Sequence, residues 1–145
     1  MTLSTFLLAI GIATSSPLFA SKLPVDDTQV PFGYVFTSKD SIGDYIESRA
    51  MYYGVNPKKA LAIAKAESNL VINAKNSEST ASGIYQFING SFKYFCIEKY
   101  KMTDTMEDKN NPYIQIECAT KLLGEGGDKH WSESSSKWSK HALNE

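Results

Sequence analysis

The sequence predicts an all-α fold, built as a single compact helical domain. Two stretches open with the same helix-start signal, Asn56-Pro57 and Asn111-Pro112. In each, the asparagine side chain accepts free amide hydrogens and the proline takes the first helical position, where its missing donor costs nothing. Apolar residues then recur at helical spacing. With residues 1–20 set aside as a leader, the 145-residue chain is long enough for one domain with its own core.

Residues 1–20 have the composition of a signal peptide. An apolar run from Phe6 to Ala13 is followed by polar residues and by Leu18-Phe19-Ala20, a plausible cleavage site. The run is too short to span a membrane comfortably. Residues 1–5 lack the usual Lys or Arg, which leaves open a start further upstream or a weak anchor. We expect an exported protein of the periplasm, the cell envelope or the extracellular space.

Residues 21–37 predict an extended lead-in, because prolines, a glycine and acidic residues interrupt any regular pattern. The domain then covers residues 38–145. Its first helix begins near Ser38 or Asp40 and stops at Gly54, which suits the left-handed closing position. The inward stripe of this helix consists of Ile42, Tyr45, Ile46, Ala50 and Tyr53.

Three further predicted helices and one polar connection follow the Gly83–Phe87 region along the chain. Ser91 is expected to cap a helix that runs to about Tyr100, and residues 102–110 form a polar connection. Residues 112–123 predict a helix that ends at Gly124. Residues 131–143 predict a weaker last helix, because its serines have poor helix propensity.

The helix predicted from Pro57 to Glu67 ends in an acidic residue on its inward face. Glu67 falls on the same stripe as Ala60, Ile63 and Ala64. Burial and the negative end of the helix dipole both disfavour the charged carboxylate, so we expect a raised pKa. A raised pKa suits a general acid. The alternative is a helix-end glutamate that is solvated or bonded to a loop amide.

A polar, turn-prone loop follows Glu67 and leads to a compact block, Gly83 to Phe87. The glycine allows close backbone approach, the tyrosine offers a flat face, and the glutamine offers a donor and an acceptor. These are the components of a carbohydrate-binding wall.

Glu67-Ser68, the loop with Ala74 and Ser77, and the block Ala81-x-Gly83-Ile84-Tyr85-Gln86 resemble the soluble lytic transglycosylase (SLT) family of the α+β lysozyme-like superfamily. The motif spans residues 60–92, and the resemblance extends more weakly over residues 38–123. It implies a helical domain with a substrate groove beside the end of the catalytic helix.

The resemblance implies a carbon-oxygen lyase that cleaves the MurNAc-GlcNAc bond of peptidoglycan without water and leaves 1,6-anhydro-MurNAc ends. Glu67 would act as acid and then as base, and the substrate's N-acetyl group would assist. Ser68 would shape the helix end, and Ser77 would contact the acetamido sugar. The substrate groove would be lined by Gly83, Ile84, Tyr85 and Gln86. Core packing is the alternative for Ile84, Tyr85 and Phe87.

One family feature is missing, an Ala-Tyr-Asn group whose tyrosine reaches the catalytic glutamate. Tyr113 and Trp138 are candidates for a partial substitute. Two other interpretations stay open. One is a hydrolytic lysozyme of the goose type, which also works from a Glu-Ser motif. The other is a non-catalytic module that binds glycan or a partner in a secretion apparatus.

Cys96 and Cys118 lie on the apolar stripes of successive predicted helices. In an exported protein they are disulfide candidates, and in a reducing space they would be two buried thiols. Adding His130 and His141 makes a nominal zinc set, but the spacings fit no compact site, so we expect no metal. We expect no cofactor either.

The charge balance excludes strong electrostatic partners. Lys and Arg number 15, Asp and Glu number 16, and the net charge is −1. A chain with this balance has no attraction to nucleic acid or to an anionic membrane. The expected partners are peptidoglycan glycan strands, with cell-envelope or secretion-apparatus proteins as further candidates; we expect a monomer.

Overall fold

The structure is a computed structural model that describes residues 35–142. The predicted signal peptide, residues 1–20, and most of the lead-in lie outside the described residues. The all-α prediction is confirmed, because the named elements of the described part are all helical. They are α1 (Lys39–Tyr52), α2 (Pro57–Ser68), α3 (Asn89–Ser91), η1 (Phe92–Lys99), η2 (Met106–Asn110), α4 (Pro112–Gly124), η3 (Gly127–Ser134) and α5 (Ser135–Ala142).

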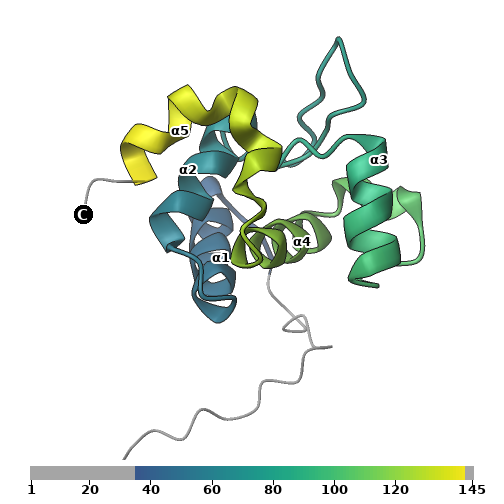
Figure 1. Cartoon of the computed structure of the whole chain (residues 1–145), viewed down its shortest axis with the longest axis horizontal. Coiled ribbons are helices and arrows are strands. Elements are labelled where there is room, and N and C mark those ends of the chain that lie inside the picture. Colours follow the sequence, from purple (N-terminus) through teal and green to yellow (C-terminus); the bar gives the residue numbers. More distant parts are fainter. Residues whose placement is uncertain (1–34, 143–145) are drawn as a thin grey trace, which may run out of the picture.

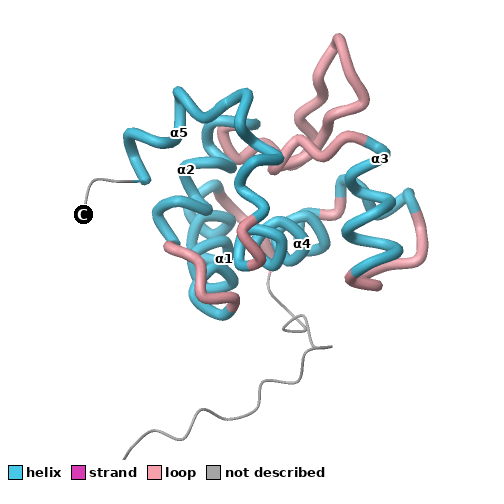
Figure 2. The backbone as a smooth tube through the Cα atoms, viewed as in Figure 1, coloured by secondary structure: helices cyan, strands magenta, loops and turns pink. Residues whose placement is uncertain are grey.

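α4 lies at the centre of the domain (Figure 1), with α1 against one side and η1 against another. α2 packs between α1 and α5. The connection from α2 to α3 is irregular and projects from the helical body, as the tube in Figure 2 shows. In this arrangement the C-terminal end of α2, the loop that follows it and the C-terminal segment lie in the same region of the molecule.

The predicted helix starts are confirmed where a side chain caps them. Ser38 caps α1 by accepting the amide of Ser41 at 3.2 Å. Asn56 accepts the amide of Lys59 at 3.3 Å, and Asn111 accepts the amide of Tyr113 at 3.1 Å. The side chains that these helices bury in the core include Ile42, Tyr45, Ile46, Ala50, Ala60, Ile63, Ala64, Ile116, Cys118, Ala119 and Leu122.

The helix expected over residues 91–100 begins earlier than predicted, and most of it is a π-helix instead of an α-helix. α3 starts at Asn89, whose amide donates to the hydroxyl of Thr80 at 3.1 Å. Ser91 therefore lies inside a helical run and makes no cap, so the capping prediction was wrong. The following residues, Phe92–Lys99, form a π-helix.

The C-terminal helix also departs from the prediction. Residues 127–134 form a 3₁₀ helix in which Trp131 has non-helical angles, and the α-helix begins only at Ser135. Trp131 is buried and donates its indole N–H to the carbonyl of Tyr85 at 2.9 Å. This tertiary contact fixes Trp131 outside the helix that the sequence pattern predicts. The polar connection 102–110 contains the short 3₁₀ helix η2.

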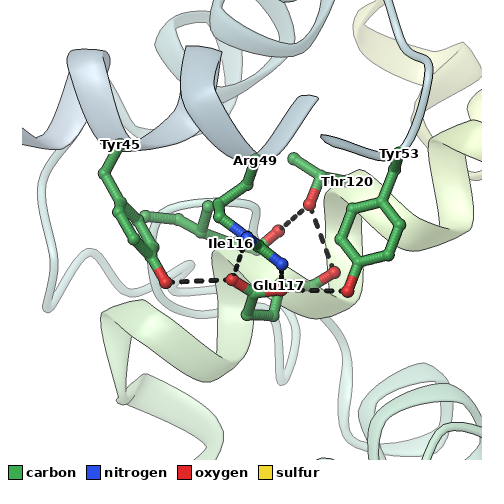
Figure 3. A network of polar contacts seen from close by, with 6 residues as sticks. All are labelled: Tyr45, Arg49, Tyr53, Ile116, Glu117 and Thr120. Atoms are coloured by element: carbon green, nitrogen blue, oxygen red, sulfur yellow. Dashed lines mark hydrogen bonds and ion pairs between the residues drawn. The ribbon is translucent and has the colours of Figure 1, made fainter. Parts of the chain in front are cut away.

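A polar network joins α1 to α4 (Figure 3). The carboxylate of Glu117 pairs with Arg49 and accepts hydrogen bonds from the hydroxyls of Tyr45 at 2.9 Å and Tyr53 at 3.0 Å. Thr120 donates to the carbonyl of Ile116 at 2.7 Å. Burial, reinforced by the Glu117 charge, raises the pKa of both tyrosines well above the usual range. Both tyrosines therefore stay neutral donors, and the network serves to hold the two helices together.

A disulfide joins η1 to α4. It links Cys96 to Cys118, which lie 22 residues apart in sequence and 5.5 Å apart between Cα atoms. Both cysteines are fully buried. The bond therefore ties the segment after the loop to the central helix.

Reduction of this disulfide should lower the free energy of unfolding by about 3 kcal/mol, because the open chain regains the entropy of a closed loop. Urea unfolding with and without dithiothreitol measures the difference. The Cys96→Ala/Cys118→Ala double variant is the control, and its midpoint should not respond to the reductant. Equal midpoints for the oxidised and the reduced wild-type protein would contradict the prediction.

Candidate active site

Glu67 lies in the last turn of α2, half-buried. The helix ends just beyond it because Asn69 and Leu70 both adopt left-handed backbone angles, with φ of 52° and 62°. Ser134 Oγ donates a hydrogen bond to Glu67 Oε1. Helix α2 thus presents one carboxyl group at its end, in contact with the C-terminal segment.

The pKa of Glu67 is raised above its ordinary value. Burial is the main cause, because it disfavours the charged form. The hydrogen bond from Ser134 and the positive charge of Lys137 act in the opposite direction without reversing the shift. The carboxyl group therefore keeps its proton to a higher pH than an exposed glutamate does.

Ser68 joins the end of α2 to the Gly83–Phe87 block. Its hydroxyl lies 2.7 Å from the carbonyl oxygen of Ile84 and 3.3 Å from that of Ala64. The contact brings Glu67 and the block to the same place, although they are separated in sequence. This position agrees with the expected role of Ser68 in shaping the helix end, which stays a prediction.

The side chain of Gln115, on α4, holds the Gly83–Phe87 block in place from the core. Gln115 Oε1 accepts the amide of Tyr85 at 2.9 Å, and its Nε2 donates to the carbonyls of Ser82 at 2.8 Å and Lys109 at 2.5 Å. Gln115 is fully buried. A polar side chain inside the core is stable only when its hydrogen bonds are made, as they are here.

Gly83 is required by this contact. Its φ is +82°, and a Cβ atom built on it would lie 2.0 Å from Gln115 Nε2. The glycine therefore meets two demands at once, a left-handed backbone and direct contact with a buried side chain. This packing fixes the position of the backbone of the Gly83–Phe87 block.

Tyr85 and Ile84 turn their side chains into the core. Both are 0% exposed. The Tyr85 hydroxyl donates to the carbonyl of Ala60 at 3.1 Å, and its ring lies 5.7 Å from that of Trp131. Sugar stacking on Tyr85 is blocked in this structure, so core packing, the alternative for these positions, describes their side chains. Phe87 is buried as well.

Gln86 and Ser77 lie closer to solvent. Gln86 has a φ of 51° and donates its side-chain amide to the carbonyls of Gly83 at 2.8 Å and Ala74 at 3.3 Å. It thereby fastens the block to the loop. Ser77 is exposed in the loop, and its contact with an acetamido sugar stays a prediction.

Lys109 anchors the end of the loop that leads into the block. The residue is buried, and its ammonium group donates to the carbonyl of Thr80 and to Asn89 Oδ1, the latter at 2.8 Å. Burial lowers the pKa of this lysine. The loop is therefore held at Thr80 as well as at the block.

Neither candidate for the missing family tyrosine is the group that bonds to Glu67. Tyr113 stacks on Phe36 with ring centroids 4.6 Å apart. Trp138 is buried and donates to the carbonyl of Trp131 at 3.1 Å. The hydroxyl in contact with Glu67 belongs to Ser134, which the sequence did not single out.

Gln115 carried a signal that sequence reasoning missed. It lies among the apolar residues of the 112–123 helix, and a polar residue on a buried stripe marks a specific hydrogen-bonding role. Ser134 carried no such signal, because it is one of several serines in a polar run.

Residues 35–142 were also searched for a metal site and for a membrane-spanning helix. These residues contain no group of three His, Cys, Asp or Glu side chains that could hold a metal ion. None of the helices in this part of the chain is both long enough and apolar enough to cross a membrane.

Comparison with known proteins identifies a family. A family model described as "Transglycosylase SLT domain" matches residues 44–134. The match includes Glu67, the Gly83–Phe87 block and Ser134. No curated protein matches, and no solved structure does.

Proposed function

Because the chain belongs to the transglycosylase SLT domain family, whose activity is the lysis of peptidoglycan, we propose that it is a lytic transglycosylase. It cleaves the β-1,4 bond between MurNAc and GlcNAc and leaves a 1,6-anhydro-MurNAc end. The observation that carries the proposal is Glu67, a half-buried carboxyl group with a raised pKa at the end of α2, joined through Ser68 to the glycine-containing block.

The reaction needs one carboxyl group that works twice. Protonated Glu67 gives its proton to the glycosidic oxygen as the bond from C1 breaks, and the N-acetyl oxygen of MurNAc assists at C1. The resulting carboxylate then takes the proton of the C6 hydroxyl, whose oxygen bonds to C1. Glu67 ends protonated again and no water is consumed. Within residues 35–142, the groups that act on its charge are the Ser134 hydroxyl and the Lys137 ammonium, which supports a one-carboxylate site.

In this proposal the backbone of Gly83, Ile84 and Tyr85 and the side chain of Gln86 form the wall of the substrate groove. Ser77 contacts the acetamido group from the loop. The buried side chains of Ile84 and Tyr85 act through the backbone that they hold in place. The wall thus owes its shape to the core behind it.

Ser134 serves this reaction by holding Glu67 in both protonation states. When Glu67 is ionised, the hydroxyl of Ser134 donates to it. When Glu67 is protonated on its other oxygen, Oε2, Oε1 is a carbonyl oxygen and still accepts from the hydroxyl of Ser134. The carboxyl group therefore keeps one direction through both proton transfers.

Replacing Ser134 by alanine should lower kcat about tenfold, because the carboxyl group loses its orientation. It should also raise the pKa of Glu67, since the lost hydrogen bond favoured the charged form. The general acid then stays protonated to higher pH, so the falling limb of the pH–rate profile moves to higher pH. The profile of kcat/KM and a carboxyl NMR titration of Glu67 measure both effects.

Ser134→Thr retains a hydroxyl and should restore most of the rate. Ser136→Ala, on an exposed position of α5, is the matched control and should behave as wild type. A Ser134→Ala variant with a normal rate and an unmoved profile would exclude a positioning role.

To test the proposal, the purified protein is incubated with peptidoglycan and the released muropeptides are identified by mass spectrometry. Anhydro products, lighter by one water than hydrolytic ones, support it. Hydrolytic products would instead identify a goose-type lysozyme. Retention on the glycan without any product would identify a binding module.

We also propose the cellular setting from the family, whose members act on peptidoglycan and are generally exported. The protein would work as a monomer in the periplasm, the cell envelope or outside the cell, with residues 1–20 as its signal peptide. A role beside a secretion apparatus is compatible with this setting. Size-exclusion chromatography and fractionation of cells that express the protein test both parts.

A further inference from the structure

One buried lysine takes no part in the proposed reaction. Within residues 35–142, Lys109 is the charged residue that the fold buries, with 7% of its surface exposed. Its ammonium group donates to the carbonyl of Thr80 and to Asn89 Oδ1, the latter at 2.8 Å. A buried charge is costly unless its hydrogen bonds are made. Here they are made to one short stretch of the chain.

The two acceptors lie at the two ends of residues 80–89, which we call the closed segment. This segment contains the Gly83–Phe87 block. The amide of Asn89 donates to the hydroxyl of Thr80 at 3.1 Å. The two ends therefore meet, and the Lys109 ammonium group lies where they meet.

Lys109 is itself held in a fixed position. It lies in η2, and its carbonyl accepts a hydrogen bond from Nε2 of the buried Gln115 at 2.5 Å. The Oδ1 atom of the next residue, Asn110, accepts a hydrogen bond from the hydroxyl of Ser82 at 2.7 Å. The stretch from Lys109 to Gln115 thus contacts the closed segment at several points, and the Lys109 side chain reaches both of its ends.

We propose that Lys109 is a positioning residue for substrate binding, because it joins the ends of the closed segment and so fixes the backbone of the Gly83–Phe87 block. This role rests on the proposed function, in which that backbone lines the substrate groove. Glu67 has support of its own from Ser134. In the described part of the chain, the lysine that acts on the pKa of Glu67 is Lys137. Lys109 therefore acts on the binding of the sugar and not on the proton transfers.

The test uses Lys109→Met, which keeps the length of the side chain and removes its ammonium group. The closed segment must then be ordered as the sugar binds, which costs binding free energy. On soluble peptidoglycan strands we expect KM to rise about tenfold, near the lower end of what hydrogen bonds to a charged group contribute, and kcat to change by less than about twofold. Lys93→Met, which removes an exposed lysine of η1, is the matched control and should keep both constants.

A purely stabilising role of Lys109 predicts the opposite result. Fewer molecules would then be folded, so the apparent kcat would fall while KM stayed the same. That result, or two unchanged constants, would overturn the positioning role.

Asn89→Ala is a milder change that carries the test if Lys109→Met does not fold. It removes one acceptor, on an exposed residue, and leaves the carbonyl of Thr80. KM should rise about threefold. In the double variant KM should rise no further than in Lys109→Met alone, because both changes break the same contact. An unchanged KM in Asn89→Ala, or effects that multiply in the double variant, would contradict the proposed role.

Hydrogen exchange followed by NMR tests the role of Lys109 without substrate. The amides of Asn89 and Ser82 both donate to acceptors within the closed segment. In Lys109→Met both should exchange about tenfold faster, because the segment opens locally more often, whereas the amide of Ala60 in α2 should keep its rate. Such a result in a protein that cleaves no glycan would support the hold of Lys109 on the segment and overturn the proposed function alone. Equal exchange rates in the variant and the wild type would overturn the role of Lys109.

Discussion

Replacing Glu67 by glutamine is expected to abolish most cleavage of peptidoglycan, with a loss of at least about 100-fold, because general acid catalysis alone contributes 10²- to 10⁴-fold. Glutamine has nearly the same shape and keeps a carbonyl oxygen for Ser134, but it can neither give nor take the proton. Both proton transfers of the proposed reaction therefore stop. Release of anhydro-muropeptides, quantified by mass, measures the loss.

Glu78→Gln is the matched control for this variant. Glu78 is exposed on the loop, so its neutralisation changes the net charge by the same amount without touching the site. The control should keep wild-type activity. A Glu67→Gln variant that retains more than about a hundredth of the wild-type rate would show that another group supplies the proton.

The same substitution should also change how stability depends on pH. A folded-state pKa above the unfolded value means that Glu67 contributes stability below its unfolded pKa and loses that contribution as pH rises through its folded pKa. Glutamine has no such dependence. The variant should therefore be at least as stable as wild type at neutral pH, and urea unfolding at acidic and neutral pH measures this. A variant less stable than wild type at neutral pH would contradict it.

Replacing Gly83 by alanine is expected to destabilise the protein by about 4 kcal/mol, near the upper end for single substitutions. Left-handed angles cost a non-glycine residue about 1 kcal/mol. The new Cβ would also collide with Gln115, which lies 2.0 Å from its position. Moving Gln115 breaks buried hydrogen bonds to Tyr85 and Ser82, and each buried group left unpaired costs about 1–3 kcal/mol.

Gly54→Ala separates the collision from the backbone strain. Gly54 has a φ of +70°, and nothing lies within 4 Å of the position that a Cβ atom would take there. This substitution should cost only about 1 kcal/mol. Urea unfolding of both variants gives the two values, and equal losses would mean that the contact with Gln115 contributes nothing.

The helical framework could be predicted from the sequence because its signals are local. Asn56 and Asn111 cap their own helices through residues two or three positions away. The 3.6-residue period placed Ala60, Ile63 and Ala64 inward, and it placed Glu67 beside them. These features depend on residues within one or two turns of the same helix, so they can be predicted directly from the sequence.

The surroundings of Glu67 and of the block depend on contacts between distant residues. Ser134 reaches Glu67 from 67 positions away, and Gln115 reaches Tyr85 from 30 positions away. The burial of Tyr85 against Trp131 likewise arises only when these segments pack together.

The sequence by itself thus determined the helical class, most of the helix starts, and a carboxyl group and a glycine-containing block as candidates for one site. The tertiary structure alone decided which hydroxyl holds that carboxyl group and which side chains fill the core. The physical reason is that propensity and capping act over a few residues, whereas side-chain contacts are set by the way helices pack.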